Sequence, residues 1–461
     1  MTGSMYAAVS GLKTHMTALS VIGNNIANVN TVGYKAARYT FNEALYSTSR
    51  GGSDGTTTAG GRNPAQNGFG ASIGTIDIDM STKNYTPTGW GLDTMIDGDG
   101  FFLVGDKVVG EDELSKITLG DLTTLKGMNL TRLGNFNIDP NGYLVDGNGS
   151  VVWGFLSVQA ATAYNTKTGE AEYLTPGDDG TLPAPTDGYT LLTEMTETEI
   201  KDLNSARRKA GLPELINIEY TEKLDAQGEI VRDDNGDAIM VVKSATVAAT
   251  SLSAMRLPVL ATKTKMEQQT GDGGVTTWVP VSPPQTTTEI IWVNPDELTD
   301  GKEVGTVEWE GLPDDGAGGG GAGAAGDVYR IEYTRVENDS VTIDEKTGAL
   351  RIMTSDGTLY TVGYLAIAKV TNPNGVTHVD GRYYQAQDGA GTIRVTSVGG
   401  AVAGVGTSGG TSLITGGLES SGTDLATEIA NMIAVQRGYQ ANTRIVSVTD
   451  SMLEELVNMK R

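Results

Sequence analysis

The chain has 461 residues, and its 57 Asp and Glu against 33 Lys and Arg give a formal net charge of −24. This acidity argues against nucleic-acid binding and against docking on anionic membranes, because both need a basic face. There is no cysteine and there are only two histidines, which excludes disulfides and thiolate chemistry and leaves little for a zinc site. The length of the chain predicts about two to four folded domains. From the composition we expect no catalytic residue, no cofactor and no metal.

The first thirty residues predict an amphipathic helix. Apolar side chains recur at alternating spacings of four and three, which is the pattern of a coiled-coil seam. The seam consists of Met5, Val9, Leu12, Met16, Leu19 and Ile26, with Ile22 beside it. A cluster of Asn24, Asn25, Asn28 and Asn30, followed by Gly33, predicts the end of the helix near there, since asparagine competes for backbone hydrogen bonds.

The last forty residues predict a second helix of the same kind. Thr423 is the expected N-cap, with Asp424 in the first turn, where a negative charge suits the helix dipole. Apolar residues again follow the four-three spacing, and a few polar groups interrupt it. The seam consists of Leu425, Ile429, Met432, Tyr439, Val446, Leu453 and Val457. Ile433 and Leu456 broaden its apolar face, Gln436 interrupts it, and Arg437 and Asn442 lie in the adjoining segment 436–442.

Between the two ends the pattern changes to short strands and tight turns. The repeated Asp-Gly at 97–100 leads into an apolar strand that starts at Phe101. Asn141-Gly142 sits at the bend of a predicted hairpin. Segments near Leu350 and Tyr360 show the same punctuation. The middle of the chain is therefore expected to be mainly β.

Residues 156–338 form a separate block with one clear helix. It is predicted from Glu197 to Ala210, because Thr196 and Glu199 form a capping box and Gly211 sits at the C-terminal cap. The rest of the block predicts hairpins. Residues 316–326 are almost entirely glycine and alanine, which indicates a plain flexible loop and not a phosphate-binding loop.

Pairing of the two end helices would nest the β blocks between them. The expected fold is a multidomain α+β protein, with the terminal helices paired as a coiled-coil stalk and mainly-β domains inserted between them. The predicted domains are a terminal helical domain (1–30 plus 420–461), an extended connector (31–72 plus 413–419), a core β domain (73–155 plus 339–412) and an inserted outer β domain (156–338). The helices either close an intramolecular hairpin only, or leave an apolar face that drives self-association.

Two acidic motifs have carboxylates at the spacing of a calcium-binding loop. They are Asp97-x-Asp99 and Asp233-x-Asn235-x-Asp237. The second lacks the following glycine and has Ser244 where a bidentate glutamate belongs, so ordinary turns are the better interpretation. Carboxylate pairs are plentiful in so acidic a chain, and none stands out as a catalytic pair.

Both ends of the chain resemble the flagellar rod and hook axial proteins. The N-terminal resemblance rests on residues 4–12 and on 21–35, which read VIGNNIANVNTVGYK. The C-terminal resemblance rests on 418–425 and on 436–442, which read QRGYQAN. Residues 91–102 and 132–136 resemble the core β domain of the same family. The large block at 156–338 and the last seven residues favour the hook members over the distal rod members.

The resemblance implies a structural role. Members of this family polymerise into a tube whose inner wall is made by the terminal helices, which implies assembly contacts at Met5, Val9, Leu12, Met16, Leu19, Ile22, Asn24, Asn25, Ile26 and Asn28 and at the C-terminal residues given above. It implies a curved, flexible universal joint that transmits motor torque from rod to filament. The implied partners are other copies of the chain, the flagellar rod, the hook cap, the hook–filament junction proteins and the export apparatus, with no nucleic acid and no membrane insertion.

The same resemblance implies an extracellular location in the flagellar hook, reached through type III export. This fits an N-terminus without a basic region and a following apolar stretch, from which we expect no cleavable signal peptide. Two alternatives stay open. One is a distal rod or other axial subunit with an inserted outer domain, and the other is a secreted adhesin or enzyme carried on an axial scaffold.

Overall fold

The computed structural model describes residues 2–52, 54–55, 60–106, 128–174, 182–224, 229–232, 237–270, 276–282, 286–291, 307–310, 328–335, 340–354, 357–379, 381–405 and 409–459. The chain divides into two compact units, which are described separately. The first contains Met1–Thr86, Asn372–Asn374 and Glu419–Arg461, and the second contains Pro87–Thr371 and Gly375–Leu418. The glycine- and alanine-rich segment 316–326 and most of the second acidic motif lie outside the described residues.

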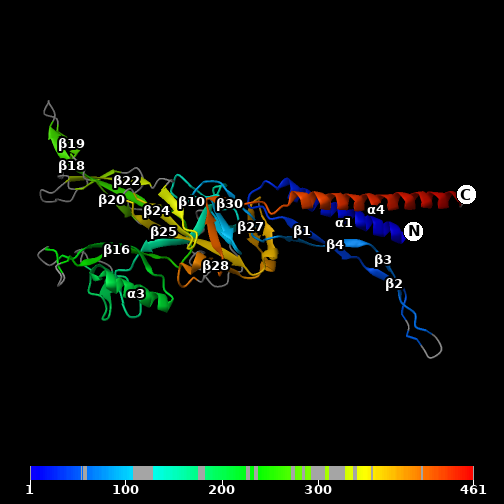
Figure 1. The fold of residues 1–461 in the computed structure, drawn as a ribbon, viewed down its shortest axis with the longest axis horizontal. Coiled ribbons are helices and arrows are strands. Elements are labelled where there is room, and N and C mark those ends of the chain that lie inside the picture. The colour runs from blue at the N-terminus through cyan, green and yellow to red at the C-terminus, as the bar shows by residue number, and fades with distance from the viewer. Residues whose placement is uncertain are drawn as a thin grey trace. The chain divides into compact units, whose positions relative to one another are not determined.

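The first unit is built from the two ends of the chain. Its long helices α1 and α4 lie side by side, β1 and β4 pair antiparallel beside α1, and β2 and β3 extend away from the helices as a two-stranded arm (Figure 1). The bounds are α1 Thr2–Ala27, β1 Ala37–Glu43, β2 Tyr46–Arg50, β3 Ala65–Gly68, β4 Ala71–Ile78 and α4 Leu425–Met459. The chain leaves this unit through β5 (Tyr85–Pro87) and returns through β30 (Gly417–Glu419).

The start of α4 differs from the sequence prediction by one residue. Asp424, and not Thr423, is the N-cap: its Oδ1 accepts the Ala426 N–H at 3.0 Å, and its Oδ2 accepts the Thr427 hydroxyl at 2.7 Å. These bonds lower the pKa of Asp424, the Thr427 hydroxyl contributing most. An aspartate placed one position later satisfies the first free amides of the helix and also suits its dipole, so it outcompetes the threonine.

The second unit is mainly β. Its strands are β6 Thr94–Asp97, β7 Phe101–Gly105, β8 Met128–Thr131, β9 Asn137–Ile138, β10 Leu144–Val145, β11 Val151–Gln159, β12 Ala163–Tyr164, β13 Ala171–Glu172, β14 Thr190–Leu191, β15 Leu215–Glu222, β16 Met240–Ala248, β17 Ser253–Ala254, β18 Val259–Thr270, β19 Thr276–Pro280, β20 Thr286–Ile291, β21 Val307–Glu310, β22 Val328–Arg335, β23 Val341–Ile343, β24 Ala349–Met353, β25 Leu359–Val370, β26 Val376–His378, β27 Tyr383–Ala386, β28 Ile393–Ser397 and β29 Ser412–Thr415. Its helices are α3 Glu197–Ala210 and short 3₁₀ turns at Leu192–Glu194, Asp388–Ala390 and Val398–Gly400, and a further 3₁₀ turn, Pro373–Gly375, lies where the chain passes between the two units.

One large sheet organises this unit. Its central path runs β15-β16-β11-β25-β7-β8-β27-β26, with antiparallel neighbours throughout. The main core beneath it gathers apolar residues from both sides of the inserted block, among them Phe102, Val152 and Leu365. The predicted turns at Gly98 and Gly142 are confirmed, and both glycines have positive φ.

The predicted helix of the inserted block is confirmed as α3. The Thr196 N–H donates to Glu199 Oε2 at 2.8 Å, as a capping box requires, and Gly211 closes the helix in the left-handed region. Ile200 and Leu203 of α3 pack into a second core with Leu215 and Val242. β11 crosses the predicted boundary at 155/156, and β15 and β16 extend the same sheet as β11 and β25. The four-domain division therefore stays a prediction.

Candidate assembly site

α1 and α4 pack antiparallel. Near the C-terminal end of α1, Asn25 Nδ2 donates to Glu428 Oε1 at 2.9 Å, and near its N-terminal end Gly11 lies against Asn442. Between these points, Ala18, Ile22 and Val435 are buried together. The two ends of the chain thus form one helical pair (Figure 1).

Small residues set the closeness of this contact. A Cβ at Gly11 would lie 2.5 Å from Asn442 Nδ2, and a Cβ at Gly438 would lie 2.6 Å from His15 Cε1. The imidazole of His15 therefore occupies the space that glycine leaves at 438, with its other neighbour, the Phe41 ring, 5.7 Å away. Glycine here serves close approach of the helices, as it does where backbones meet in other tightly packed helix pairs.

Most of the predicted seam of α1 lies beside this contact, and only its last residues, Leu19 and Ile26, pack against it. The residues that meet α4 fall on the row Ala8, Gly11, His15, Ala18 and Ile22, which has the same three-four spacing as the predicted seam. Ile22 is fully buried, whereas Met16 is 60% exposed. Ile26 and Leu19 are half-buried and pack against the Ala18–Ile22 cluster. Met5 is exposed, Val9 and Leu12 are half-buried, and the asparagines 24, 25 and 28 lie at the last turn.

The predicted α4 residues divide in the same way. Met432 packs against the buried cluster, and Asn442 contacts Gly11. Ile433 is 54% exposed and lies on the outer face with Leu425 and Ile429. Tyr439 and Val446 are half-buried, whereas Gln436, Arg437, Leu453 and Leu456 are exposed.

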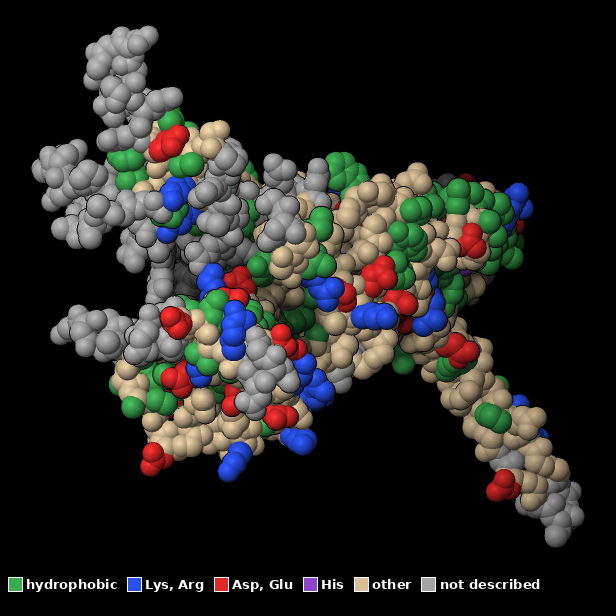
Figure 2. Space-filling view, turned by 60° about the vertical axis from the view of Figure 1, so that its left-hand side comes forward, with side chains coloured by type: hydrophobic (Ala, Val, Ile, Leu, Met, Phe, Trp, Pro, Cys, Tyr) green, Lys and Arg blue, Asp and Glu red, His purple; other side chains and the backbone are tan. Residues whose placement is uncertain are grey.

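Apolar side chains, exposed or half-buried, also line the sides of the two helices that face away from their contact. Successive helix residues are about 100° apart, so Leu425, Ile429 and Ile433 share one side of α4. The predicted seam of α1 falls on the same side of the antiparallel pair. We call this surface the seam stripe; it consists of Met5, Val9, Leu12 and Met16 of α1 and Leu425, Ile429 and Ile433 of α4. Figure 2 shows hydrophobic side chains gathered on the visible face of the helices.

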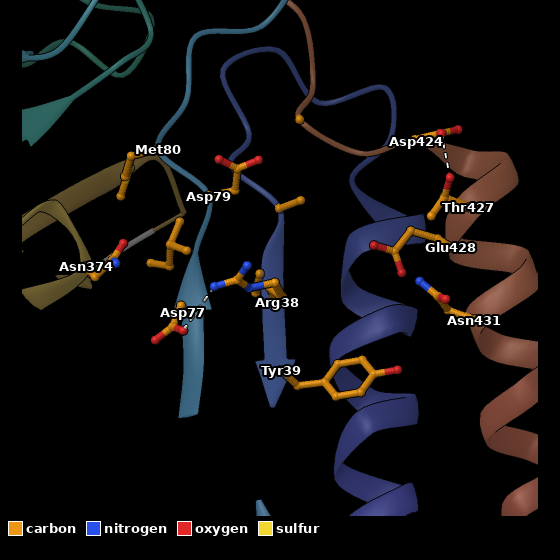
Figure 3. Close-up of a pocket in the computed structure, with 14 residues that line it drawn as sticks. Arg38, Tyr39, Asp77, Asp79, Met80, Asn374, Asp424, Thr427, Glu428 and Asn431 are labelled. Atoms are coloured by element: carbon orange, nitrogen blue, oxygen red, sulfur yellow. Dashed lines mark hydrogen bonds and ion pairs between the residues drawn. The ribbon is translucent and has the colours of Figure 1, made fainter. Parts of the chain in front are cut away.

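Asn25 is the polar centre at the base of the helix pair. Its Nδ2 donates to Ala37 O at 2.8 Å and to Glu428 Oε1, while its Oδ1 accepts the Ala37 N–H and the Tyr34 hydroxyl, each at 3.0 Å. The side-chain amide is thus fully used, although Asn25 is buried. Figure 3 shows Glu428 on α4 turned toward α1. Burial, and then the charge of Glu428, raise the pKa of Tyr34 and of Tyr39, so both phenols stay neutral.

A buried ion pair joins the segments that follow α1 and precede α4. Lys35 Nζ lies 2.6 Å from Glu419 Oε1, and both side chains are about 1% exposed. Lys35 Nζ also donates to Ser81 O at 2.8 Å, and the same Glu419 oxygen accepts the Lys83 N–H at 2.8 Å. A buried pair with these additional bonds holds one geometry, because separating either charge would leave the other desolvated.

Asp79 supports this clamp from the adjoining turn. It accepts the Ser81 N–H at 3.1 Å and the Lys83 Nζ at 2.6 Å. Burial alone would raise the pKa of Asp79, but the hydrogen bonds from Lys83 and Ser81 prevail and lower it to about 2. Asp79 also lines a cavity of about 650 Å³ within the first unit, beside Arg38, Asp77 and Glu428 (Figure 3).

Within the described residues, no group of His, Asp and Glu side chains is arranged to hold a metal ion. No helix in this part of the chain is both long and apolar enough to cross a membrane.

Comparison with known proteins matches both ends of the chain to flagellar families. Residues 5–35 match the family described as "Flagella basal body rod protein", and residues 414–459 match "Flagellar basal body rod FlgEFG protein C-terminal". The flagellar hook protein FlgE of Borreliella burgdorferi is 25% identical over 480 residues, covering 100% of both chains. FlgE of Treponema pallidum is also 25% identical, over 505 residues and 100% of both chains.

The chain is therefore similar to flagellar rod and hook axial proteins at both ends, and to flagellar hook proteins over its full length. A second kind of relative is the basal-body rod protein FlgG of Bacillus subtilis, which is 46% identical over 149 residues, or 32% of this chain and 50% of that protein. The two matched family segments contain α1 and α4 and end or begin beside the clamp residues, Lys35 at the end of one and Glu419 near the start of the other. The axial-protein segments are thus the ones that the first unit brings together.

The sequence prediction named part of the helix contact (Ile22, Met432 and Asn442) but missed other residues that hold the first unit together. Gly11, His15, Gly438 and the pair Lys35–Glu419 were not among the predicted site residues. A signal was present, because Ala8, Gly11, His15, Ala18 and Ile22 repeat at heptad spacing. Small residues contribute little to a hydrophobic pattern, so the pattern marked the neighbouring, more apolar row.

We predict opposite effects of the same substitution at two glycines of the helix pair. Gly23→Ala has open space around its Cβ, so the free energy of unfolding should rise by about 0.5–1 kcal/mol from reduced backbone entropy. Gly438→Ala gains the same helix propensity, but its methyl group collides with His15, so the free energy of unfolding should fall by ~1–3 kcal/mol. Urea unfolding of the monomer, followed by circular dichroism at 222 nm, measures both. Equal stabilisation by the two substitutions would contradict the close contact at Gly438.

We predict that Glu419→Gln destabilises the first unit by about 3–5 kcal/mol, because it leaves the Lys35 ammonium buried without its counter-charge. The matched control is Glu197→Gln, which removes the carboxylate of the exposed Glu197–Lys201 pair and should not change stability measurably. Amide exchange of α1 and α4 reports on the first unit separately from the β unit. Unchanged exchange in Glu419→Gln would show that the buried pair does not hold the segments.

Proposed function

We propose that this chain is the structural subunit of the bacterial flagellar hook, and that it polymerises through its helix pair into a curved, flexible tube. The observation that carries the proposal is the full-length similarity to flagellar hook proteins, which includes the large inserted block. The seam stripe supports it, since an exposed apolar surface of this length on a soluble chain is typical of a protein–protein contact.

The distal rod subunit is the second candidate. The match to the rod protein FlgG is stronger in identity but covers only 32% of this chain, so it leaves most of the chain without a counterpart. The hook proteins align over the whole of it. A rod also has to be stiff, whereas a hook bends, and the shape of the assembled tube therefore distinguishes the two candidates.

The finer parts of the proposal follow from the family and from the surface chemistry. We place the helix pair in an inner tube as a coiled coil, with the predicted residues of α1 and α4 as assembly contacts, and the β domains outside it. A net charge of −24 keeps the β surfaces polar and mutually repulsive, which favours weak contacts that slide as the tube bends. The location would be outside the cell, between rod and filament, with the hook cap, junction proteins and export apparatus as partners. Catalysis has no part in this function.

We predict that a charge in the seam stripe abolishes assembly. Ile433→Asp and Met16→Asp place a carboxylate on a surface that assembly would bury, so polymerisation at high concentration should fall by at least tenfold, a loss of about 1.4 kcal/mol or more per contact. Electron microscopy and pelleting of the full-length protein measure it. The control is Val379→Asp, an exposed apolar residue of the second unit, which should polymerise normally.

The wild-type tubes decide between the candidate functions. Curved tubes support the hook, and straight, stiff tubes support a rod subunit. Monomers alone, with or without fragments of preformed hook as seeds, would overturn the proposed function.

A further inference from the structure

A second apolar surface lies on α4, away from the seam stripe. It consists of Ile445, Val448, Met452, Leu456 and Met459, all exposed and spaced by three or four residues. The side chain of Val448, for example, is 59% exposed. We call it the C-terminal stripe.

The two stripes lie on opposite sides of the helix pair. The face of α4 that meets α1 is centred on Val435, Gly438 and Asn442. From that face, the Leu425–Ile433 side of the seam stripe is rotated by about 140° in one sense, and the C-terminal stripe by about 80° in the other, at about 100° per residue. One copy therefore presents two different apolar surfaces that it cannot bring together by itself.

The charges beside the stripes are complementary. Lys13 and Arg437 border the seam stripe, and Lys13 is the one Lys, Arg, Asp or Glu side chain in α1. Glu455 borders the C-terminal stripe, in a region where Asp450 and Glu454 are also acidic. Within the described part of the chain, Lys13, Arg437 and Glu455 form no ion pair. Acidic residues in the last turns of a helix oppose its dipole, so their placement is not explained by the stability of α4.

We propose that the C-terminal stripe of one copy packs on the seam stripe of a second copy, with Glu455 of one facing Lys13 and Arg437 of the other. This inference rests on the proposed function and specifies its contact. Pairing of two unlike surfaces is heterologous, so each added copy leaves one stripe of each kind free, and growth continues when the rotation between copies does not close a ring. Pairing of like stripes would close a dimer and stop growth.

The absence of cysteine in the sequence allows a direct test. Met16→Cys marks the seam stripe and Val448→Cys marks the C-terminal stripe, and within one copy they lie on opposite sides of the pair. The double variant, polymerised and treated with a short bis-maleimide, should give a ladder of covalent oligomers. Each single variant should stay monomeric on a denaturing gel, and a mixture of the two should stop at dimers.

The outcomes separate the inference from the proposed function. Cross-linked dimers from either single variant would show like-to-like packing and overturn the inference. Polymers of the double variant without a ladder would overturn it too, while the proposed function stands. Failure of the wild-type chain to polymerise, even with seeds, would remove the proposed function and the inference together.

Exchanging two charges tests whether Lys13 of one copy faces Glu455 of another. Lys13→Glu should raise the critical concentration for polymerisation by about threefold or more, and adding Glu455→Lys should restore most of it. Lys209→Glu, on the exposed face of α3, makes the same charge change outside the stripes and should have no effect. If Glu455→Lys does not restore the Lys13→Glu variant, Glu455 does not face Lys13.

Discussion

The antiparallel contact between α1 and α4 determines the rest of the first unit. It joins the two ends of the chain. The segment between residues 27 and 425 therefore has to start and finish at the same end of the helix pair. The ion pair of Lys35 and Glu419 lies at this point. Asn25, in the last turn of α1, hydrogen-bonds to the first residue of β1 and to Glu428 in the first turn of α4. A buried ion pair and a saturated amide add little net stability compared with apolar packing, but they tolerate few alternative geometries. Their role here is therefore to fix the position of the segments that follow α1 and precede α4.

The choice of small residues for that contact has a consequence for the outer surface. Because Gly11 and Gly438 let the helices approach closely, the pair needs few large apolar side chains between its members. The larger apolar residues of both helices are then left on the outside, where a monomer gains nothing from them. A sequence that pairs through glycine and exposes methionine, leucine and isoleucine leaves hydrophobic area free for the contacts between copies that we propose.

Much of this fold was predictable from the sequence, and the part that was not has a physical reason. The helices, the turns at Gly98 and Gly142 and the limits of α3 follow from local signals such as capping and left-handed glycine, which depend on neighbouring residues alone. Only part of the contact between α1 and α4 was predictable, because periodicity locates an apolar row but does not say what covers it. The clamp was not predicted, since Lys35 and Glu419 are distant in sequence and the motifs that contain them do not show that the two side chains meet. The joining of β15 and β16 to the main sheet is likewise a long-range pairing without a local signal.

Charge explains how such a chain stays soluble before it assembles. With exposed apolar rows on its helices, an uncharged chain would associate without order, whereas 57 acidic side chains keep separate copies apart. Salt at about 0.1 M largely screens this repulsion between charges that are more than about 10 Å apart. It hardly weakens the packing of buried apolar surface. The repulsion is greatest between the acidic β surfaces and smallest along α1, where Lys13 is the only formal charge at neutral pH. Charge repulsion between copies is therefore weak along α1, which favours approach through the helical pair.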